Sequence, residues 1–216
     1  MKYKWLQKQN NDKLIVFFNG WGMDENIVSH LDCGDYDVVI FYDYNSLETD
    51  IDLPLYKEKY IVGWSMGVMV SCLEETKQIR EGAKSYIAVC GTPLPVNNDY
   101  GIPEKIYNMT IRGFNELSSK KFISRMFTEK TIPETVTKRT LDSQKEELIQ
   151  LLKYQVNDGV KFDKVIVAEK DIIIPTKNQL NYWNKTDTDI TFIHSGHCPF
   201  LLYNKWAELV EICKRV

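Results

Sequence analysis

Residues 60–67 read Tyr60-Ile61-Val62-Gly63-Trp64-Ser65-Met66-Gly67, an apolar run that leads into the pattern G-x-S-x-G. The run predicts a buried strand, and the apolar residues 68–73 that follow predict a helix. A serine at such a strand-to-helix turn forms a nucleophile elbow, which lifts its hydroxyl above the edge of a sheet. The glycines have a steric reason, because strand and helix come so close that side chains there would collide. The stretch therefore predicts Ser65 as a nucleophile.

Apolar runs of strand length recur along the chain and alternate with helical patterns. We expect strands at residues 13–18, 36–42, 60–62, 85–90, 164–168 and 190–193, and helices at 25–31, 66–80 and 199–215. Near-continuous apolar strands separated by helices indicate a parallel sheet that is covered on both faces. The expected fold is α/β, with the α/β-hydrolase arrangement of a mainly parallel, doubly wound sheet in one domain over residues 1–216.

Residues 101–159 interrupt this alternation between the fourth and fifth expected strands. Residues 146–152 have helical spacing, and Phe122, Ile123, Met126 and Phe127 are placed to form one apolar face. The stretch is too long for a simple loop in a compact domain, so it predicts an inserted helical structure. In hydrolases an insertion at this place is a lid over the active site. The alternative is a helical excursion without a role in substrate binding.

Composition excludes several classes of function. The chain has 216 residues, 44% hydrophobic and 26% charged, with a net charge of −3, so nucleic acid is not an expected partner. Neither a signal-peptide segment nor an apolar run of about 20 residues is present, so we expect no membrane association. The five cysteines are scattered without a C-x-x-C pair, which predicts buried free thiols, a cytoplasmic location and no metal site.

A serine nucleophile needs a histidine base, and the chain has three histidines. His30 falls in the first expected helix, whereas His194 and His197 follow the last expected strand. The loop after the last strand is where this fold brings its histidine over the serine, in the chain order nucleophile, acid, histidine. We favour His197, because Gly196 precedes it on a turn, while His194 directly ends the strand and fits a structural role.

The histidine in turn needs a carboxylate, and Asp171 follows the fifth expected strand, 26 residues before His197. Its carboxylate would fix the imidazole tautomer and stabilise the imidazolium. Glu169 is the nearest rival, although it lies closer to the strand. The loop after the fourth strand, residues 91–95, contains no carboxylate before Asp99.

An oxyanion hole requires two backbone amides, and the expected donors are Met66, directly after the nucleophile, and Trp21. Trp21 lies between Gly20 and Gly22 after the first expected strand, so its backbone can turn inward. The two glycines also suit an ordinary strand-to-helix turn. We expect Trp21, Trp64 and Met66 to line an apolar substrate pocket, with simple core packing as the alternative for Trp64.

Further segments resemble, in order and spacing, the BioG-type esterases of biotin synthesis. They are Asn19-Gly20-Trp21-Gly22, Tyr42-Asp43-Tyr44, Cys90-Gly91-Thr92-Pro93-Leu94-Pro95, Gly101-Ile102-Pro103, Glu169-Lys170-Asp171 and Gly196-His197-Cys198-Pro199-Phe200. The resemblance runs from about residue 13 to residue 205. It implies hydrolysis of the methyl ester of pimeloyl-[acyl carrier protein], with the triad on Ser65, Asp171 and His197 and with acyl carrier protein as the partner. No metal or organic cofactor is implied. BioH-type hydrolases usually have histidine where this chain has Asn19.

Charge is distributed unevenly along the chain. Residues 110–140 hold seven basic and three acidic side chains, a net of +4, whereas residues 24–59 hold ten acids and two lysines, a net of −8. A positive lid suits an acidic carrier protein, because charge steers encounter, and we assign docking to Lys120, Lys121 and Arg125. The alternative is an ordinary solvated helix face.

Other functions remain compatible with the same residues. An acyl-carrier or acyl-CoA thioesterase would use the same triad, and an acyltransferase would need a lid that excludes water. A catalytically inactive hydrolase-fold binding protein would be expected to have a broken triad, whereas all three members are present here.

Overall fold

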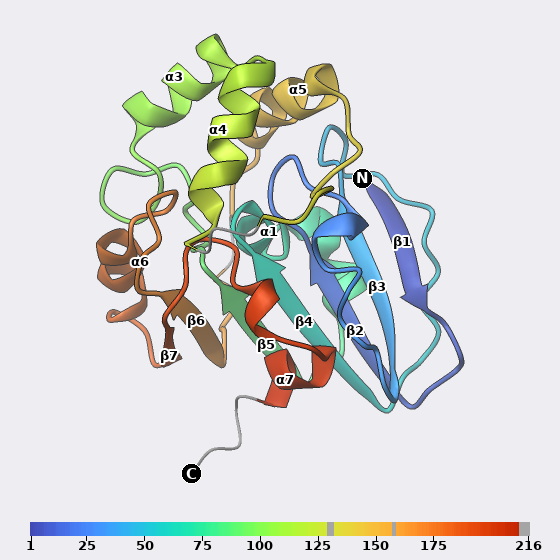
Figure 1. Ribbon diagram of the computed structural model, residues 1–216. Helices are drawn as coiled ribbons and strands as arrows, with labels where there is room; N and C mark the ends of the chain where they lie inside the picture. Colours follow the sequence, from blue (N-terminus) through green and yellow to red (C-terminus); the bar gives the residue numbers. More distant parts are fainter. Residues whose placement is uncertain (129–131, 157–158, 212–216) are drawn as a thin grey trace.

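The chain folds around one seven-stranded sheet with the strand order β1-β3-β2-β4-β5-β6-β7 (Figure 1). The computed structural model describes residues 1–216 except 129–131, 157–158 and 212–216. The strands are β1 Lys2–Gln7, β2 Lys13–Phe18, β3 Tyr36–Tyr42, β4 Glu58–Trp64, β5 Ser85–Val89, β6 Lys164–Ala168 and β7 Asp189–Ile193. All neighbouring strands are parallel except β1 and β3. The six predicted strands and their mainly parallel arrangement are confirmed.

Both faces of the sheet are buried, because side chains alternate along each strand. In β2, Ile15 and Phe17 join a cluster with η1 Glu25–Ile27 and α7 Trp206–Glu211. The alternate residues of β2 face a cluster that contains side chains of α1 Met66–Val70 and α2 Lys77–Arg80. α6 Thr176–Trp183 packs beside α1 over β5 and β6. This double covering explains why the strands consist of almost uninterrupted apolar residues.

Strand β1 was not predicted from the sequence. It pairs antiparallel with β3 at the edge of the sheet, and its residues are only half buried or exposed. Lys2 and Lys4 are exposed and alternate with Tyr3 and Trp5, which pack against the core. Such a polar edge strand lacks the continuous apolar run of a central strand, and edge lysines discourage pairing with a second chain.

The predicted helix at residues 66–80 is broken into α1, η2 Glu74–Thr76 and α2. Side chains compete for the helix carbonyls at the break. The hydroxyl of Ser71 donates to the carbonyl of Val68 at 2.8 Å, and the hydroxyl of Thr76 donates to the carbonyls of Val70 and Leu73 at 2.9 Å. Such local hydrogen bonds offer the backbone an alternative to the helix.

Two other predicted helices are shorter than expected. Residues 25–31 form only the single 3-10 turn η1, which Asp24 caps through the amide of Asn26. Residues 199–215 form η3 Phe200–Leu202 and then α7, and residues 212–215 lie outside the described part. Between η3 and α7 the backbone leaves the helix to exchange hydrogen bonds with Asp32, whose amide donates to Asn204 and whose carbonyl accepts from Trp206.

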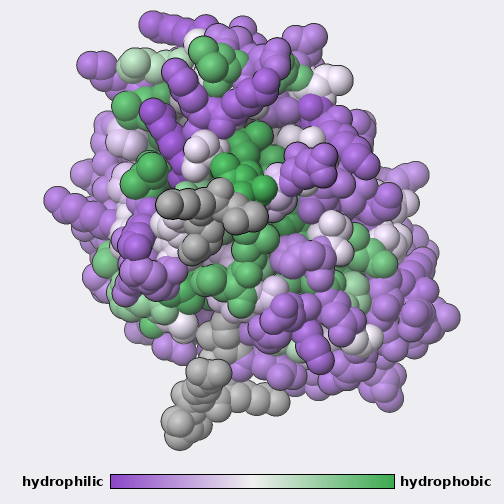
Figure 2. All heavy atoms as spheres, in the orientation of Figure 1, coloured by the Kyte–Doolittle hydropathy of each residue, from purple (hydrophilic) through white to green (hydrophobic). Residues whose placement is uncertain are grey.

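Residues 101–159, where described, contain three helices that lie over the carboxyl ends of the strands (Figure 1). They are α3 Glu104–Gly113, α4 Glu116–Met126 and α5 Leu141–Leu151. A capping box between Asn115 and Ser118 fixes the start of α4. Figure 2 shows a mostly hydrophilic surface on this side, with an apolar strip where the helices meet the sheet. We refer to residues 101–156 of this region as the α3–α5 segment.

The described residues contain neither a membrane span nor a metal cluster. Every helix there is too short or too polar to cross a bilayer. No three His, Cys, Asp or Glu side chains gather in that part of the chain in a way that would hold a metal ion.

Candidate active site

Ser65 lies at the sharp turn between β4 and α1, with a positive φ of 55° and a ψ of −121°. Few residues other than glycine adopt such a backbone, so the surroundings must hold it in place. The amide of Ser65 donates to the carbonyl of Val89 at 3.0 Å. A Cβ on Gly63 would lie 2.8 Å from the Cα of Val68, and one on Gly67 would lie 2.0 Å from the carbonyl oxygen of Phe18. The steric reason predicted for both glycines is thus confirmed.

A continuous chain of hydrogen bonds joins three of the predicted site residues. Nε2 of His197 lies 2.8 Å from Oγ of Ser65, and its Nδ1 lies 2.7 Å from Oδ2 of Asp171. All three residues are buried. A neutral imidazole that donates from Nδ1 to the carboxylate leaves Nε2 to accept from the serine hydroxyl. The arrangement can therefore take a proton from Ser65 and hold the resulting imidazolium beside an anion.

Asp171 is held by three further donors. Its Oδ1 accepts the amides of Ile173 at 2.8 Å and Ile174 at 3.0 Å, and its Oδ2 accepts Nε2 of Gln179 at 2.8 Å. Gln179 comes from the buried side of α6. Sequence reasoning missed this residue, because a glutamine within a helix gives no local sign that its side chain turns inward.

The rival residues do not reach the serine. His194 pairs with Glu169 at 2.8 Å on the surface, and both side chains are well exposed. His30 is exposed, and its Nε2 lies 3.0 Å from the carbonyl oxygen of Phe200. The structure therefore brings His197 and Asp171 to Ser65 and leaves their rivals apart.

The two predicted oxyanion donors lie in the same pocket as Ser65. Within the described residues, neither the Trp21 amide nor the Met66 amide has a hydrogen-bond acceptor in the protein. The neighbouring Gly20 amide is occupied, because it donates to Oδ1 of Asn19 at 2.9 Å. Nδ2 of Asn19 in turn donates to the carbonyl of Asp24 at 2.8 Å, which closes the loop on itself. This role of Asn19 was not predicted.

The pocket around Ser65 is small and apolar. Its volume is about 30 Å³, enough for roughly two water molecules. Tryptophan and α4 side chains close it. Its lining comprises Gly20, Trp21, Trp64, Ser65, Met66, Ile102, Tyr107, Thr110, Phe122, Met126, Leu148, Ile173 and His197. In this arrangement of side chains the space is too small for an acyl chain.

Both predicted pocket tryptophans line this space, and each also has a fixed structural contact. Nε1 of Trp64 donates to the carbonyl of His197 at 2.9 Å, so the residue both faces the pocket and fills the core. The Trp21 ring packs edge-on against Phe114 and Phe122, with ring centroids 5.2 and 4.8 Å apart.

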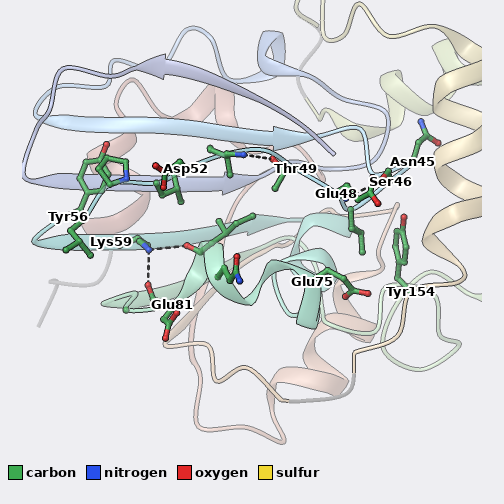
Figure 3. A pocket seen from close by; sticks show the side chains of 18 residues that line it. Asn45, Ser46, Glu48, Thr49, Asp52, Tyr56, Lys59, Glu75, Glu81 and Tyr154 are labelled. Atoms are coloured by element: carbon green, nitrogen blue, oxygen red, sulfur yellow. Dashed lines mark hydrogen bonds between the residues drawn. The ribbon is translucent and has the colours of Figure 1, made fainter.

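A much larger groove, of about 840 Å³, lies elsewhere (Figure 3). The loop of residues 45–56 forms one side, and Glu75, Glu81 and Tyr154 contribute to its lining. Lys59 in this groove is tied to the carbonyls of Ile79 and Glu81 at 3.2 and 2.8 Å (Figure 3). None of the predicted catalytic or oxyanion residues lines the groove. The hydrogen-bonded Ser65 and His197 therefore lie at the small pocket and not at the larger groove.

The three residues assigned to docking are all exposed on α4. Lys120 pairs with Glu116 at 2.7 Å on the same helix, which offsets part of its charge. Arg139, which contributes to the positive balance of residues 110–140, is buried between Asp43 and Glu147. Lys130 and Glu129, also part of that balance, lie outside the described residues. The exposed net positive charge of residues 110–140 is therefore smaller than the +4 counted from the sequence.

Two comparisons with known protein sequences gave matches over most of this chain. A family model described as "Pimeloyl-ACP methyl esterase BioG" matches residues 1–209. A malonyl-[acyl-carrier protein] O-methyltransferase of Bacteroides fragilis is 34% identical over 191 residues, which cover 85% of this chain and 39% of that protein. This chain thus spans well under half the length of that relative.

Solved structures show the same fold. BioG from Haemophilus influenzae superposes with a TM-score of 0.84 at 30% identity, covering 97% of this chain and 99% of that one. An esterase from Exiguobacterium antarcticum superposes with a TM-score of 0.67 at 16% identity, covering 92% and 89% of the two chains. The predicted α/β-hydrolase fold is confirmed.

Proposed function

The chain belongs to the BioG family of pimeloyl-ACP methyl esterases, and from this premise we propose that it cleaves the methyl ester of pimeloyl-[acyl carrier protein] in biotin synthesis. Ser65, His197 and Asp171 are the catalytic residues in this proposal. The observation that carries it is the unbroken hydrogen-bond chain from Asp171 through His197 to Ser65, which ends in an apolar pocket. We place the reaction in the cytoplasm, where the four described cysteines would remain free thiols.

Acylation begins when Nε2 of His197 takes the proton of the Ser65 hydroxyl. The serine oxygen attacks the ester carbonyl, and the amides of Trp21 and Met66 receive the negative oxygen of the tetrahedral intermediate. The imidazolium then donates its proton to the departing methoxide, which leaves as methanol. The product of this half-reaction is an acyl-enzyme on Ser65.

Deacylation repeats these steps with water as the nucleophile. Nε2 of His197 takes a proton from water, the hydroxide attacks the acyl-enzyme carbonyl, and the imidazolium returns its proton to Ser65. The acyl chain leaves with a free carboxylate at the end that had carried the methyl group. With water as the second substrate, these side chains and amides carry out the proton transfers and stabilise the negative oxygen in both steps.

We assign the α3–α5 segment as the lid of this pocket. All three of its helices contribute to the pocket lining, which includes Tyr107 and Thr110 of α3, Phe122 and Met126 of α4, and Leu148 of α5. Since the pocket is too small for an acyl chain, α4 is the element whose displacement would admit substrate. Movements of this kind commonly accompany substrate binding in enzymes with covered sites.

The carrier protein docks, in this proposal, on the exposed basic side chains of α4. Opposite charges raise the rate of encounter more than they deepen the affinity. The test is the triple charge reversal Lys120→Glu, Lys121→Glu and Arg125→Glu. We expect kcat/KM to fall for the carrier-bound ester and to remain unchanged for a small methyl ester without carrier. Wild-type kcat/KM on the carrier-bound ester would overturn this docking site.

The reaction itself is tested by mass spectrometry of pimeloyl-carrier methyl ester after incubation with wild type and Ser65→Ala. We expect loss of one CH₂ with the wild type alone, together with release of methanol. Release of free carrier thiol instead of methanol would identify a thioesterase. An unchanged substrate with correctly folded wild type would indicate a binding protein that does not catalyse the reaction.

A further inference from the structure

The loop that supplies Trp21 is fastened to the α3–α5 side of the molecule at three points. Oδ2 of Asp24 accepts the amide of Lys138 at 2.6 Å, and Nε1 of Trp21 donates to the carbonyl of Gln144 at 2.7 Å. The third contact joins the backbone amide of Gly22 to Oε2 of Glu147, at 2.9 Å. Residues more than a hundred positions later in the chain thus hold the loop that follows β2.

Glu147 is a fully buried carboxylate on α5 with donors around both oxygens. Oε1 accepts the amide of Tyr44 at 2.7 Å, and Oε2 accepts NH1 of Arg139 at 2.5 Å in addition to the Gly22 amide. NH2 of Arg139 also donates to Asp43 at 2.9 Å. Burial raises the pKa of Glu147, while Arg139 and the two amides oppose this rise. A buried acid with every oxygen engaged by N–H donors is expected to have a defined orientation.

This contact bears directly on the direction of the Trp21 amide. The Trp21 amide belongs to the Gly20–Trp21 peptide group. The preceding peptide group is fixed because its Gly20 amide donates to Asn19. The following one is fixed because its Gly22 amide donates to Glu147. The carbonyl of Gly20 belongs to the same planar peptide group as the Trp21 amide and accepts the amide of Met23 at 3.4 Å, so this group is held within the loop between its two fixed neighbours. Gly22 permits the bend with a positive φ of 75°. Trp21, whose amide has no acceptor among the described residues, lines the same pocket as Ser65.

We infer that Glu147 is a positioning residue of the oxyanion hole, whose buried carboxylate holds the Gly22 amide and thereby orients the Trp21 amide toward the reacting carbonyl. The inference rests on the proposed function, because it assumes an acyl transfer at Ser65. On this inference the helices of the α3–α5 segment have different roles. α5 carries Glu147, which holds the oxyanion loop, so α5 must stay in place, whereas α4 covers the pocket and must move to admit substrate.

The test compares Glu147→Gln with Asp43→Asn. Glutamine keeps one oxygen acceptor but turns an NH₂ group toward the other donors, so the loop loses one of its fixed contacts. Asparagine at position 43 weakens the same Arg139 cluster without touching Gly22. For Glu147→Gln we expect kcat to fall about 10- to 100-fold, less than the full loss of an oxyanion donor, with KM nearly unchanged. Asp43→Asn should lower the melting temperature and leave kcat within about twofold of wild type.

The second readout is inhibition by an alkyl trifluoromethyl ketone, which adds to Ser65 and places a tetrahedral oxyanion in the hole. We expect its Ki in Glu147→Gln to rise by the same factor as kcat falls, because both report transition-state stabilisation. Asp43→Asn should not change this Ki. A merely structural role of Glu147 would lower the melting temperature and the fraction of active enzyme without changing the Ki.

A third variant provides a test in case Glu147→Gln does not fold. Arg139→Gln with Glu147→Gln removes both charges of this pair, and Asp43 keeps its ion pair with Lys2 at 2.8 Å, so no unpaired ion stays buried. The same loss of kcat and rise of Ki in this double variant supports the inference. Wild-type kcat and Ki in either folded Glu147 variant would overturn it. If wild-type enzyme itself releases no methanol, the proposed function fails instead, so the two failures are distinguishable.

Discussion

Two histidine–carboxylate pairs lie on the same two loops, after β6 and β7, and only one of them reaches the serine. His197 and Asp171 are 2.7 Å apart with side-chain exposures of 1% and 0%, whereas His194 and Glu169 are 2.8 Å apart with exposures of 71% and 49%. The lengths of the two contacts are nearly equal. What differs is burial and the number of additional partners.

The buried pair is oriented from both ends. Ser65 meets the far nitrogen of His197, and two amides together with Gln179 hold the carboxylate of Asp171. Water competes for the exposed pair, and exposed pairs of this kind contribute little to stability. We therefore expect burial and the additional contacts, and not the length of the contact to the acid, to decide which histidine acts as a catalytic base.

Replacing the histidines should produce the largest difference. We expect His197→Ala to lower kcat by about 10⁶-fold, because the serine loses its only base, as the joint action of triad members implies. His194→Ala is the matched control and should leave kcat unchanged. The measurement is the initial rate of methanol release under substrate saturation. Comparable losses in both variants would show that burial and additional contacts do not decide which histidine acts as the base.

Replacing the acids should produce the next largest effect. Asp171→Asn keeps the shape of the side chain but removes its charge and favours the wrong imidazole tautomer, so kcat should fall by about 10⁴-fold. Glu169→Gln serves as the control, and its kcat should match that of the wild type. Steady-state kinetics at neutral pH decides the matter. A strong loss in Glu169→Gln would mean that the exposed pair takes part in catalysis.

A smaller effect is expected from the residue that holds the carboxylate. Gln179→Leu removes the donor to Oδ2 of Asp171, so the acid is less firmly oriented and kcat should fall about tenfold, the lower end of outer-shell effects. Asn181→Ala, on the same helix, loses only an exposed contact to the carbonyl of Asp99 and is the control. Single-turnover kinetics should locate the loss in the chemical step. An unaltered rate in folded Gln179→Leu would show that the two amides suffice.

No loss of activity is expected from thiol alkylation. Burial raises the pKa of Cys198, next to His197, to about 12. At pH 8 only about 10⁻⁴ of such a thiol is ionised, and only the thiolate reacts. Iodoacetamide should therefore leave kcat unchanged in folded protein, while all five cysteines react after unfolding. Inactivation in step with labelling of Cys198 would show that this buried region opens to solvent.

The three residues of the proposed triad could be located from the sequence because each one follows an apolar strand. Ser65, Asp171 and His197 succeed β4, β6 and β7, and parallel strands bring their carboxyl ends to one edge of the sheet. The same reasoning located six strands. It missed β1, whose half-exposed residues alternate, and it overextended the helix from residue 66, because hydroxyl contacts from Ser71 and Thr76 are not visible as a pattern.

The supporting residues were not predictable, because their environment depends on tertiary structure. Glu146 and Glu147 are adjacent in one helical pattern, yet the first is exposed and the second fully buried against Arg139. Arg139 was counted as part of a positive surface, although it lies inside the protein. Sequence periodicity identifies apolar faces well, but it does not reveal which charged residue on a helix meets a buried partner.

The contact between the end of α4 and the loop of His197 determines where α4 would pivot. The carbonyl of Met126, its last residue, accepts the amide of Cys198, and a Cβ on Gly196 would lie 2.6 Å from that carbonyl oxygen. The end of α4 is thus anchored on the turn that carries His197. In the lid movement proposed above, a helix anchored there would turn as a lever. Its 11 residues span about 16 Å, so a rotation of about 20° would move its far end by about 5 Å. Such a swing would carry Phe122 away from Trp21 while the pivot, and with it the base, stays in register.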